Sequence, residues 1–164
     1  MSGAGKSTVG KAAAAQAGIP FVDLDQEIEK AAGKTIPAIF ESLGESGFRE
    51  LETAATEAAL AGDPAVIASG AGWIATARNR ALLLSRGRII YLRAAVETAA
   101  ARLGQEHGRP MLAGSATIER LRRLEAERAA FYELADASID TEGLTLQQVT
   151  DKLSDLIKVF RGEK

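Results

Sequence analysis

Cysteine is absent from the 164 residues, which excludes disulfide bridges, thiolate metal sites and cysteine nucleophiles together. Aromatic residues reach only 5%, a proportion that suits helices with small packed faces. The formal net charge of −2 provides no general basic field that would hold nucleic acid or anionic lipid. No apolar run approaches the ~20 residues of a membrane span. We therefore expect a cytoplasmic protein with neither nucleic acid nor a membrane as a partner.

The sequence has the length and composition of one folded domain over residues 1–164, with 46% apolar and 26% charged residues. Its apolar period changes repeatedly between about 2 and about 3.6 residues. Strand-like runs occupy residues 21–23, 65–68, 88–92 and 137–140, and helical stretches occupy residues 6–17, 36–60, 94–103, 115–134 and 145–160. This alternation predicts an α/β fold with a parallel sheet covered by helices on both faces. Ligands bind at the carboxyl ends of the strands in such sheets.

Glycine is concentrated at the start of the chain, where Gly3-Ala4-Gly5-Lys6-Ser7-Thr8 has the pattern that ends a P-loop. Glycines let backbone N–H groups wrap phosphate oxygens, and the helix that follows directs its positive end at them. Lys6 would bridge the β- and γ-phosphates, and the Ser7 hydroxyl would ligate Mg²⁺. The pattern predicts ATP and Mg²⁺ as cofactors. The alternative is a flexible Gly/Ser terminus ahead of a helix.

Two carboxylates, Asp23 and Asp25, follow the first strand-like run. Side chains at positions i and i+2 at the end of a strand can diverge toward different ligands. One carboxylate would face the waters of a metal ion, and the other would face a substrate hydroxyl. The alternative is that Asp25 only caps the next helix, a position that Asp favours.

A basic residue, Arg49, lies within the long helical stretch. Its guanidinium could bind a substrate carboxylate through two parallel hydrogen bonds. The alternative is a solvated helix arginine paired with Glu45 four residues before it or Glu52 three residues after it.

Taken together, these strings resemble the shikimate kinase family. The family pattern is G-x-G-K-S-T, D-x-D, I-F-x-x-x-G-E-x-x-F-R-x-x-E, a strand ending in G-G-G, R-P-L-L, and R-x-x-x-Y. After its glycine-rich start this chain has, in the same order, Asp23-Leu24-Asp25, the complete string over residues 39–52, Gly70-Ala71-Gly72, Arg109-Pro110-Met111-Leu112 and Arg128-Ala129-Ala130-Phe131-Tyr132.

The resemblance implies a P-loop kinase that phosphorylates the 3-hydroxyl of shikimate with ATP, a step toward chorismate and the aromatic amino acids. Asp25 would bind the ring hydroxyls and act as the base, or orient the attacking hydroxyl. Asp23 would hold Mg²⁺ through water. Arg49 and Arg128 would bind the substrate carboxylate. Backbone groups of Gly70, Ala71 and Gly72 would line the substrate pocket of a monomeric enzyme.

The resemblance also implies a lid over residues 104–114, which would close to exclude water from the site. Arg109 in that lid would reach the phosphates with the help of Arg102, and would complete the catalytic set with Lys6 and Asp25.

Purely structural roles would also explain several of these features. Residues 70–72 could form an ordinary turn, Arg128 could pair with Glu125, and residues 104–114 could be a plain surface loop. His107 is expected to be solvent-exposed.

Three features depart from the family pattern. Ala71 replaces the middle glycine, and a methyl group there would cost about 1 kcal/mol if the backbone needed a positive φ. Trp73, expected in the core or the pocket wall, is larger than the family's usual residue. The first P-loop glycine and its strand would precede Met1. We expect about 8–12 apolar residues to be missing there, and expect the strands near residues 65 and 88 to face a gap.

Two other functions fit parts of the pattern. Another small-molecule P-loop kinase, of the gluconate type, shares G-K-S and an acidic substrate. A nucleotide-binding module without catalysis would fit the incomplete P-loop and Ala71.

Overall fold

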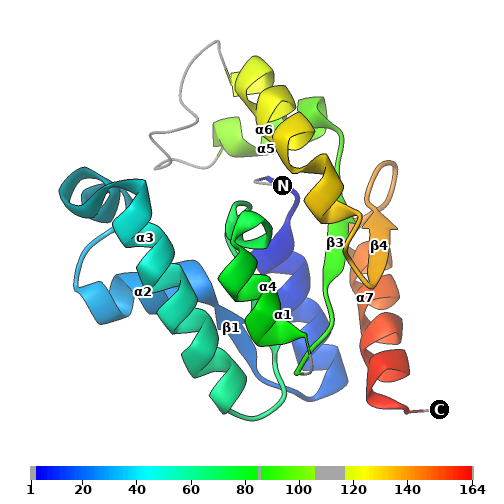
Figure 1. Ribbon diagram of the computed structural model, residues 1–164. Coiled ribbons are helices and arrows are strands. Elements are labelled where there is room, and N and C mark those ends of the chain that lie inside the picture. The colour runs from blue at the N-terminus through cyan, green and yellow to red at the C-terminus, as the bar shows by residue number, and fades with distance from the viewer. Residues whose placement is uncertain (1–2, 85, 106–116, 164) are drawn as a thin grey trace.

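The computed structural model describes residues 3–84, 86–105 and 117–163, which fold into strands alternating with helices (Figure 1). The elements in chain order are α1 (Lys6–Ala17), β1 (Phe21–Asp23), α2 (Leu24–Ala32), α3 (Ile36–Ala61), β2 (Val66–Ala68), the 3₁₀ turn η1 (Trp73–Ala75), α4 (Ala77–Leu83), β3 (Ile90–Arg93), α5 (Val96–Gln105), α6 (Thr117–Tyr132), β4 (Ala137–Asp140) and α7 (Leu146–Arg161). The predicted alternation of strands and helices is confirmed. None of the described helices is both long and apolar enough to cross a membrane.

The four strands form two parallel pairs. Strand β1 pairs with β2 so that Val22 lies opposite Ile67, and β3 pairs with β4 so that Leu92 lies opposite Ile139. Neighbouring residues of a strand point to opposite faces of the sheet. Accordingly, Val66 packs in the cluster that contains α1 and α7, whereas Ile67 packs in the cluster around Trp73. Helices therefore cover both faces of the strands, as the alternation predicted.

The two faces are covered by different helices. Helix α1 packs against α7 and against β1 and β2, and it contributes Val9 and Ala13 to the largest buried cluster. On the other face, α3 supplies Ala55 and Ala59, which pack around Trp73. In Figure 1, α2 and α3 lie on one side of β1, α7 lies beside β4, and α5 and α6 lie together at the top. The N-terminal end of α1 points toward that same upper edge.

Helix α3 is interrupted at Gly44, whose φ of 67° and ψ of −173° are not helical. A positive φ costs glycine little, because glycine has no Cβ. The predicted helical stretch over residues 36–60 is therefore present but broken at Gly44. The break separates a short N-terminal part from the longer part that carries Arg49 and Glu52.

Other predicted boundaries shift by about two residues. Strand β3 begins at Ile90 rather than residue 88, α5 begins at Val96 rather than residue 94, and α6 ends at Tyr132 rather than residue 134. Helix α5 continues to Gln105, and residues 106–114 of the expected lid lie outside the described residues, so the lid stays a prediction. The helical stretches predicted from the apolar period omitted α2, which is 9 residues long, and α4, which is 7 residues long.

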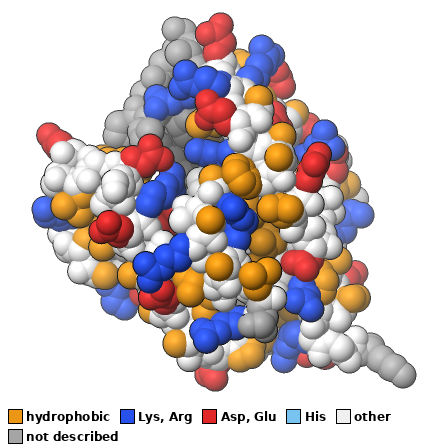
Figure 2. All heavy atoms as spheres, in the orientation of Figure 1, with side chains coloured by type: hydrophobic (Ala, Val, Ile, Leu, Met, Phe, Trp, Pro, Cys, Tyr) orange, Lys and Arg blue, Asp and Glu red, His pale blue; other side chains and the backbone are white. Residues whose placement is uncertain are grey.

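The two strand pairs are separated by a groove. Among the described strands, β2 and β3 do not pair with each other. A cavity of about 510 Å³ lies between them, lined by apolar side chains of both strands and by Gly10 of α1. On the face seen in Figure 2, hydrophobic side chains are exposed near the middle and are flanked by Lys and Arg side chains. The gap expected from the sequence is present, and what belongs before Met1 stays a prediction.

Helix α3 contacts α2 through a fully buried side chain, Ile39, which is 0% exposed and packs with Ile28 and Phe48. We predict that Ile39→Ala lowers the free energy of unfolding by about 2–5 kcal/mol, because it removes buried methyl groups and leaves a cavity. Leu43→Ala is the matched control, since Leu43 lies one turn later and is 55% exposed. Urea denaturation of both variants would contradict this packing if the two changes cost the same.

Candidate active site

The glycine-rich start of the chain forms a tight loop before α1. Gly3 has a φ of 75° and Gly5 a φ of 82°, both in the left-handed region that favours glycine. A Cβ on Gly3 would also lie 2.5 Å from the carbonyl oxygen of Ala99, so only glycine fits there. Helix α1 begins at Lys6, directly after Gly5. Its N-terminal N–H groups and positive dipole end form a suitable environment for a phosphate group.

The remaining residues of the predicted phosphate loop lie around this turn. Ala4 is 1% exposed and packs in the core, whereas Thr8 lies on the exposed side of α1. Arg102 of α5 donates to the carbonyl oxygen of Gly3 at 3.5 Å, which brings its guanidinium beside the loop. Lys6 lines the groove between β2 and β3.

Ser7 and Asp23 are joined by a short hydrogen bond. The Ser7 hydroxyl donates to Asp23 Oδ2 at 2.6 Å, and Asp23 Oδ1 accepts from the backbone N–H of Asp25 at 3.1 Å. Asp23 is thus the residue that caps α2, and the alternative that gave this role to Asp25 was wrong. A hydroxyl and a carboxylate are the hard oxygen ligands that Mg²⁺ prefers, and a nucleotide-bound Mg²⁺ takes only one or two of them. The two side chains therefore fit the ion that the sequence predicted.

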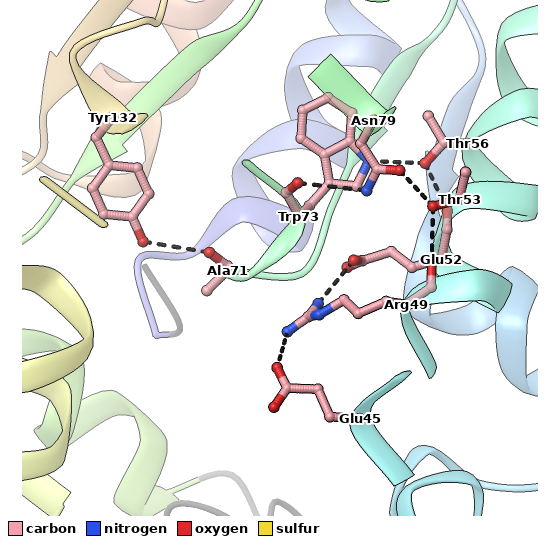
Figure 3. Close-up of polar contacts among 9 residues, drawn as sticks. All are labelled: Glu45, Arg49, Glu52, Thr53, Thr56, Ala71, Trp73, Asn79 and Tyr132. Carbon is pink, nitrogen blue, oxygen red and sulfur yellow. Dashed lines mark hydrogen bonds and ion pairs between the residues drawn. The ribbon is translucent and has the colours of Figure 1, made fainter. Parts of the chain in front are cut away.

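Arg49 is held between two carboxylates on α3 (Figure 3). Its Nη1 donates to Glu52 Oε2 at 2.8 Å, and its Nη2 donates to Glu45 Oε1 at 3.2 Å. The two partners differ in exposure, because the Glu45 side chain is 69% exposed and the Glu52 side chain is 0% exposed. Both pairings considered for Arg49 from the sequence are therefore present at once.

Glu52 is a fully buried carboxylate whose second oxygen, Oε1, has no hydrogen-bond partner within the described part of the chain. Burial raises the pKa of Glu52 above its ordinary value of 4.5, although the charge and hydrogen bond of Arg49 oppose that effect. Burial would by itself lower the pKa of Arg49, but the charge and hydrogen bond of Glu52 outweigh it and raise that pKa. The pair thus fixes a permanently charged guanidinium in place.

The turn after β2 packs directly against this pair. A Cβ on Gly72 would lie 2.3 Å from Arg49 Nη2, and a Cβ on Gly70 would lie 2.9 Å from Glu52 Oε1 and 3.5 Å from Asp25 Oδ1. Glycine is therefore needed at positions 70 and 72, because it lets the backbone of the turn approach these charged side chains closely. Ala71 between them is not strained, because no described residue other than glycine has a positive φ.

Helix α6 brings Arg128 to the same place. The charge of Arg128 acts on Tyr132, one turn later, and on the buried Glu52. The Tyr132 hydroxyl donates to the carbonyl oxygen of Ala71 at 3.4 Å, and the Tyr132 ring stacks on Tyr91 with centroids 4.4 Å apart. Burial raises the pKa of Tyr132, so this hydroxyl remains a donor at neutral pH.

The structure thus brings together most of the side chains singled out from the sequence. Asp25, Arg49, Arg128 and the turn 70–72 meet at the carboxyl end of β1 and β2, and Ser7 joins them through Asp23. Arg109 and His107 lie outside the described residues. Sequence reasoning considered Glu52 only as a solvated partner of Arg49, because spacing alone does not show that a glutamate is buried.

A family model described as shikimate kinase matches residues 2–158. The chain belongs to the shikimate kinase family. With this membership goes ATP-dependent phosphorylation of shikimate in the biosynthesis of aromatic amino acids. A shikimate kinase of Thioalkalivibrio sulfidiphilus is 39% identical over 153 residues, which cover 93% of this chain and 80% of the relative. One of Stenotrophomonas maltophilia is 40% identical over 92% of this chain and 84% of the relative.

Solved shikimate kinases have the same fold. The Acinetobacter baumannii enzyme, in complex with shikimate, aligns with a TM-score of 0.88 at 38% identity, over 94% of this chain and 87% of the solved chain. The Bacteroides thetaiotaomicron enzyme aligns with a TM-score of 0.88 at 29% identity, over 95% of this chain and 93% of the solved one. The predicted α/β P-loop fold is confirmed.

The raised pKa of Glu52 leads to a prediction for stability against pH in this shikimate kinase. Below pH 4.5 the carboxyl is neutral in both the folded and the unfolded chain. As the pH rises through the raised pKa, the folded chain must ionise a buried group, so part of the stability is lost. The uncharged Glu52→Gln variant escapes this loss.

We therefore expect the stability of Glu52→Gln relative to the parent chain to increase as the pH rises from 4.5 to neutrality. The measurement is urea denaturation of both proteins at a series of pH values. A stability difference that stays flat, or that moves in the opposite direction, would contradict the direction of the Glu52 shift.

Proposed function

We propose that this chain transfers the γ-phosphoryl group of ATP to the 3-hydroxyl of shikimate, with substrate roles as follows. The observation that carries the proposal is the meeting of Arg49 and Asp25 at the turn 70–72, with Ser7 of the glycine-rich loop joined to Asp25 through Asp23. Phosphoryl transfer needs positioning and charge neutralisation more than covalent chemistry. Each of those needs is met by a described side chain.

Arg49 binds the substrate carboxylate in this proposal. Glu52 and Glu45 each accept one of its N–H groups, and a guanidinium has five. Glu45 is largely exposed, and an exposed ion pair is worth only about 0–1 kcal/mol. A substrate carboxylate can therefore replace Glu45 at Nη2, while the buried Glu52 keeps the guanidinium in place. Arg128 approaches from α6 as the second cation.

Asp25 lies beside Gly70, and in this proposal it binds the ring hydroxyls. A Cβ on Gly70 would lie 3.5 Å from Asp25 Oδ1, which is an ordinary van der Waals contact. In this position Asp25 orients the 3-hydroxyl and accepts its proton. The backbone groups of Gly70, Ala71 and Gly72 line the pocket between Asp25 and Arg49.

The phosphates of ATP lie on residues Gly3 to Thr8 in this proposal, with Lys6 bridging the β- and γ-phosphates. When bound, Mg²⁺ would neutralise phosphate charge. Ser7 and Asp23 would hold the ion, since their oxygens already lie 2.6 Å apart. Arg102 reaches the same loop through Gly3. The contribution of Arg109 to the phosphates stays a prediction.

We also propose that the enzyme acts as a monomer in the cytoplasm, with shikimate as its small-molecule partner. Among the described residues, the groups named above come from one chain, from the loop before α1, from α1, β1, α2, α3, α5 and α6, and from the turn after β2.

The direct test is a coupled assay of ADP release with ATP and Mg²⁺, with and without shikimate. We expect ADP release that depends on shikimate. A folded sample that binds ATP but releases no ADP with shikimate, or with any acceptor in a panel that includes gluconate, would instead indicate a nucleotide-binding module. Release with gluconate alone would indicate the other kinase class.

Three variants separate the proposed roles. Lys6→Ala is expected to abolish most turnover, because the charge that stabilises the transferred group is removed. Asp25→Asn is expected to lower kcat strongly while ATP affinity stays unchanged. Arg49→Ala is expected to raise the KM for shikimate mainly. An equal loss of ATP affinity in all three would point to misfolding and would void the assignments.

Gly72→Ala tests whether the turn forms part of the carboxylate site. Gly72 has a φ of −86° and a ψ of −11°, which alanine adopts without strain, so only the contact with Arg49 opposes the change. We expect the KM for shikimate to rise about tenfold with little change in the KM for ATP. Gly62→Ala is the control, since its Cβ would meet nothing closer than 3.7 Å. An unchanged KM for shikimate in Gly72→Ala would show that the turn does not form part of the carboxylate site.

A further inference from the structure

The turn that lines the proposed substrate pocket is closed by Trp73, the only tryptophan of the chain. The backbone N–H of Trp73 donates to the carbonyl oxygen of Gly70 at 3.1 Å, which makes residues 70–73 a hydrogen-bonded β-turn. Gly72 has the dihedral angles of the third residue of a type I turn. Trp73 is therefore the residue at which the turn ends, and its position sets the position of the turn.

Two connections run from Trp73 to helix α3. Its indole N–H donates to Thr56 Oγ1 at 2.8 Å, and the Thr56 hydroxyl donates to the carbonyl oxygen of Glu52 at 2.7 Å. Asn79 Nδ2 donates to the carbonyl oxygen of Trp73 at 3.4 Å, and Asn79 Oδ1 accepts from Thr53 Oγ1 at 2.7 Å. Figure 3 shows both connections beside the Arg49–Glu52 pair.

These connections start from the helix face that carries the carboxylate site. Residues 49, 52, 53 and 56 are related by steps of three and four, so they lie along one side of α3. Thr53, Thr56 and Asn79 are all buried, with exposed fractions of 6%, 2% and 0%. Hydrogen bonds among buried groups resist breaking, because a lost partner leaves a donor or acceptor without water. The face of α3 that holds Arg49 is thus fixed rigidly to the turn that touches Arg49.

We propose that Trp73 is a positioning residue for the substrate carboxylate: through Thr56 it fixes the β-turn 70–73 against α3, and so holds Gly72 in close contact with the Arg49 guanidinium. The inference rests on the proposed function, because it assigns the carboxylate to that guanidinium. Trp73 does not touch the substrate in this account. It acts through Gly72, which packs so closely against Arg49 that an added Cβ would collide with Nη2, so that a small shift of the turn shifts the guanidinium.

The test is steady-state kinetics of Thr56→Val, which keeps the shape of the side chain and removes the acceptor of the indole N–H. We expect the KM for shikimate to rise about three- to tenfold, with the KM for ATP unchanged. Thr56→Ser retains the hydroxyl and is expected to restore the parent KM. Trp73→Phe is expected to raise the KM for shikimate in the same way. Combined with Thr56→Val it should add little, because both changes break one connection.

Thr150→Val is the matched control for a merely structural effect. Thr150 on α7 is also 2% exposed, and its hydroxyl donates to the carbonyl oxygen of Leu146 at 2.8 Å, as that of Thr56 does to Glu52. We expect Thr150→Val to change thermal stability without changing the KM for shikimate.

The outcomes distinguish this inference from the proposed function. A parent chain without shikimate-dependent ADP release would overturn the proposed function, and this inference with it. An active parent chain, with Thr56→Val lowering the melting temperature but leaving the KM for shikimate unchanged, would overturn this inference alone. Equal increases in the KM values for shikimate and ATP would also overturn it, since a local shift of the turn does not reach the phosphate loop.

Discussion

The buried ion pair between Arg49 and Glu52 is the interaction on which the site depends. A carboxylate with 0% exposure is costly to ionise, and breaking such a pair by removing one partner costs about 3–5 kcal/mol. The pair holds the guanidinium in a fixed place, and this guanidinium has further N–H groups that can bind a ligand. Around it lie Gly72 and Gly70, which have no side chains that would occupy the space. The turn after β2 can approach the pair closely because residues 70 and 72 are glycines.

The two halves of the site are positioned by different physical means. The phosphate loop is fixed by backbone conformation, since Gly3 and Gly5 adopt left-handed φ values and α1 begins directly after them. The proposed substrate half is fixed by side-chain hydrogen bonds among buried groups of α3, α4 and η1. Asp23 joins the two halves, because it accepts from Ser7 on one side and from the N–H of Asp25 on the other.

The sequence predicted those features that depend on residues close together in the chain. The Gly-Lys-Ser-Thr string predicted the phosphate loop, and period changes predicted most helices within about two residues of their observed ends. It could not show that Gly44 interrupts α3, because a helical pattern tolerates an isolated glycine. Nor could it show which aspartate caps α2, since both Asp23 and Asp25 suit that position. Glu52 packs against Gly70 of the turn after β2, which is distant in sequence, so spacing on α3 does not reveal its burial.

The central claim is that this shikimate kinase recognises the substrate carboxylate by a guanidinium that Glu52 holds in place. The most direct measurement is calorimetric titration of the protein with shikimate and with its uncharged carboxamide. The account predicts that the parent chain binds shikimate at least about tenfold more tightly, and that Arg49→Ala binds the two compounds equally. Equal affinity of the parent chain for both compounds would contradict the account.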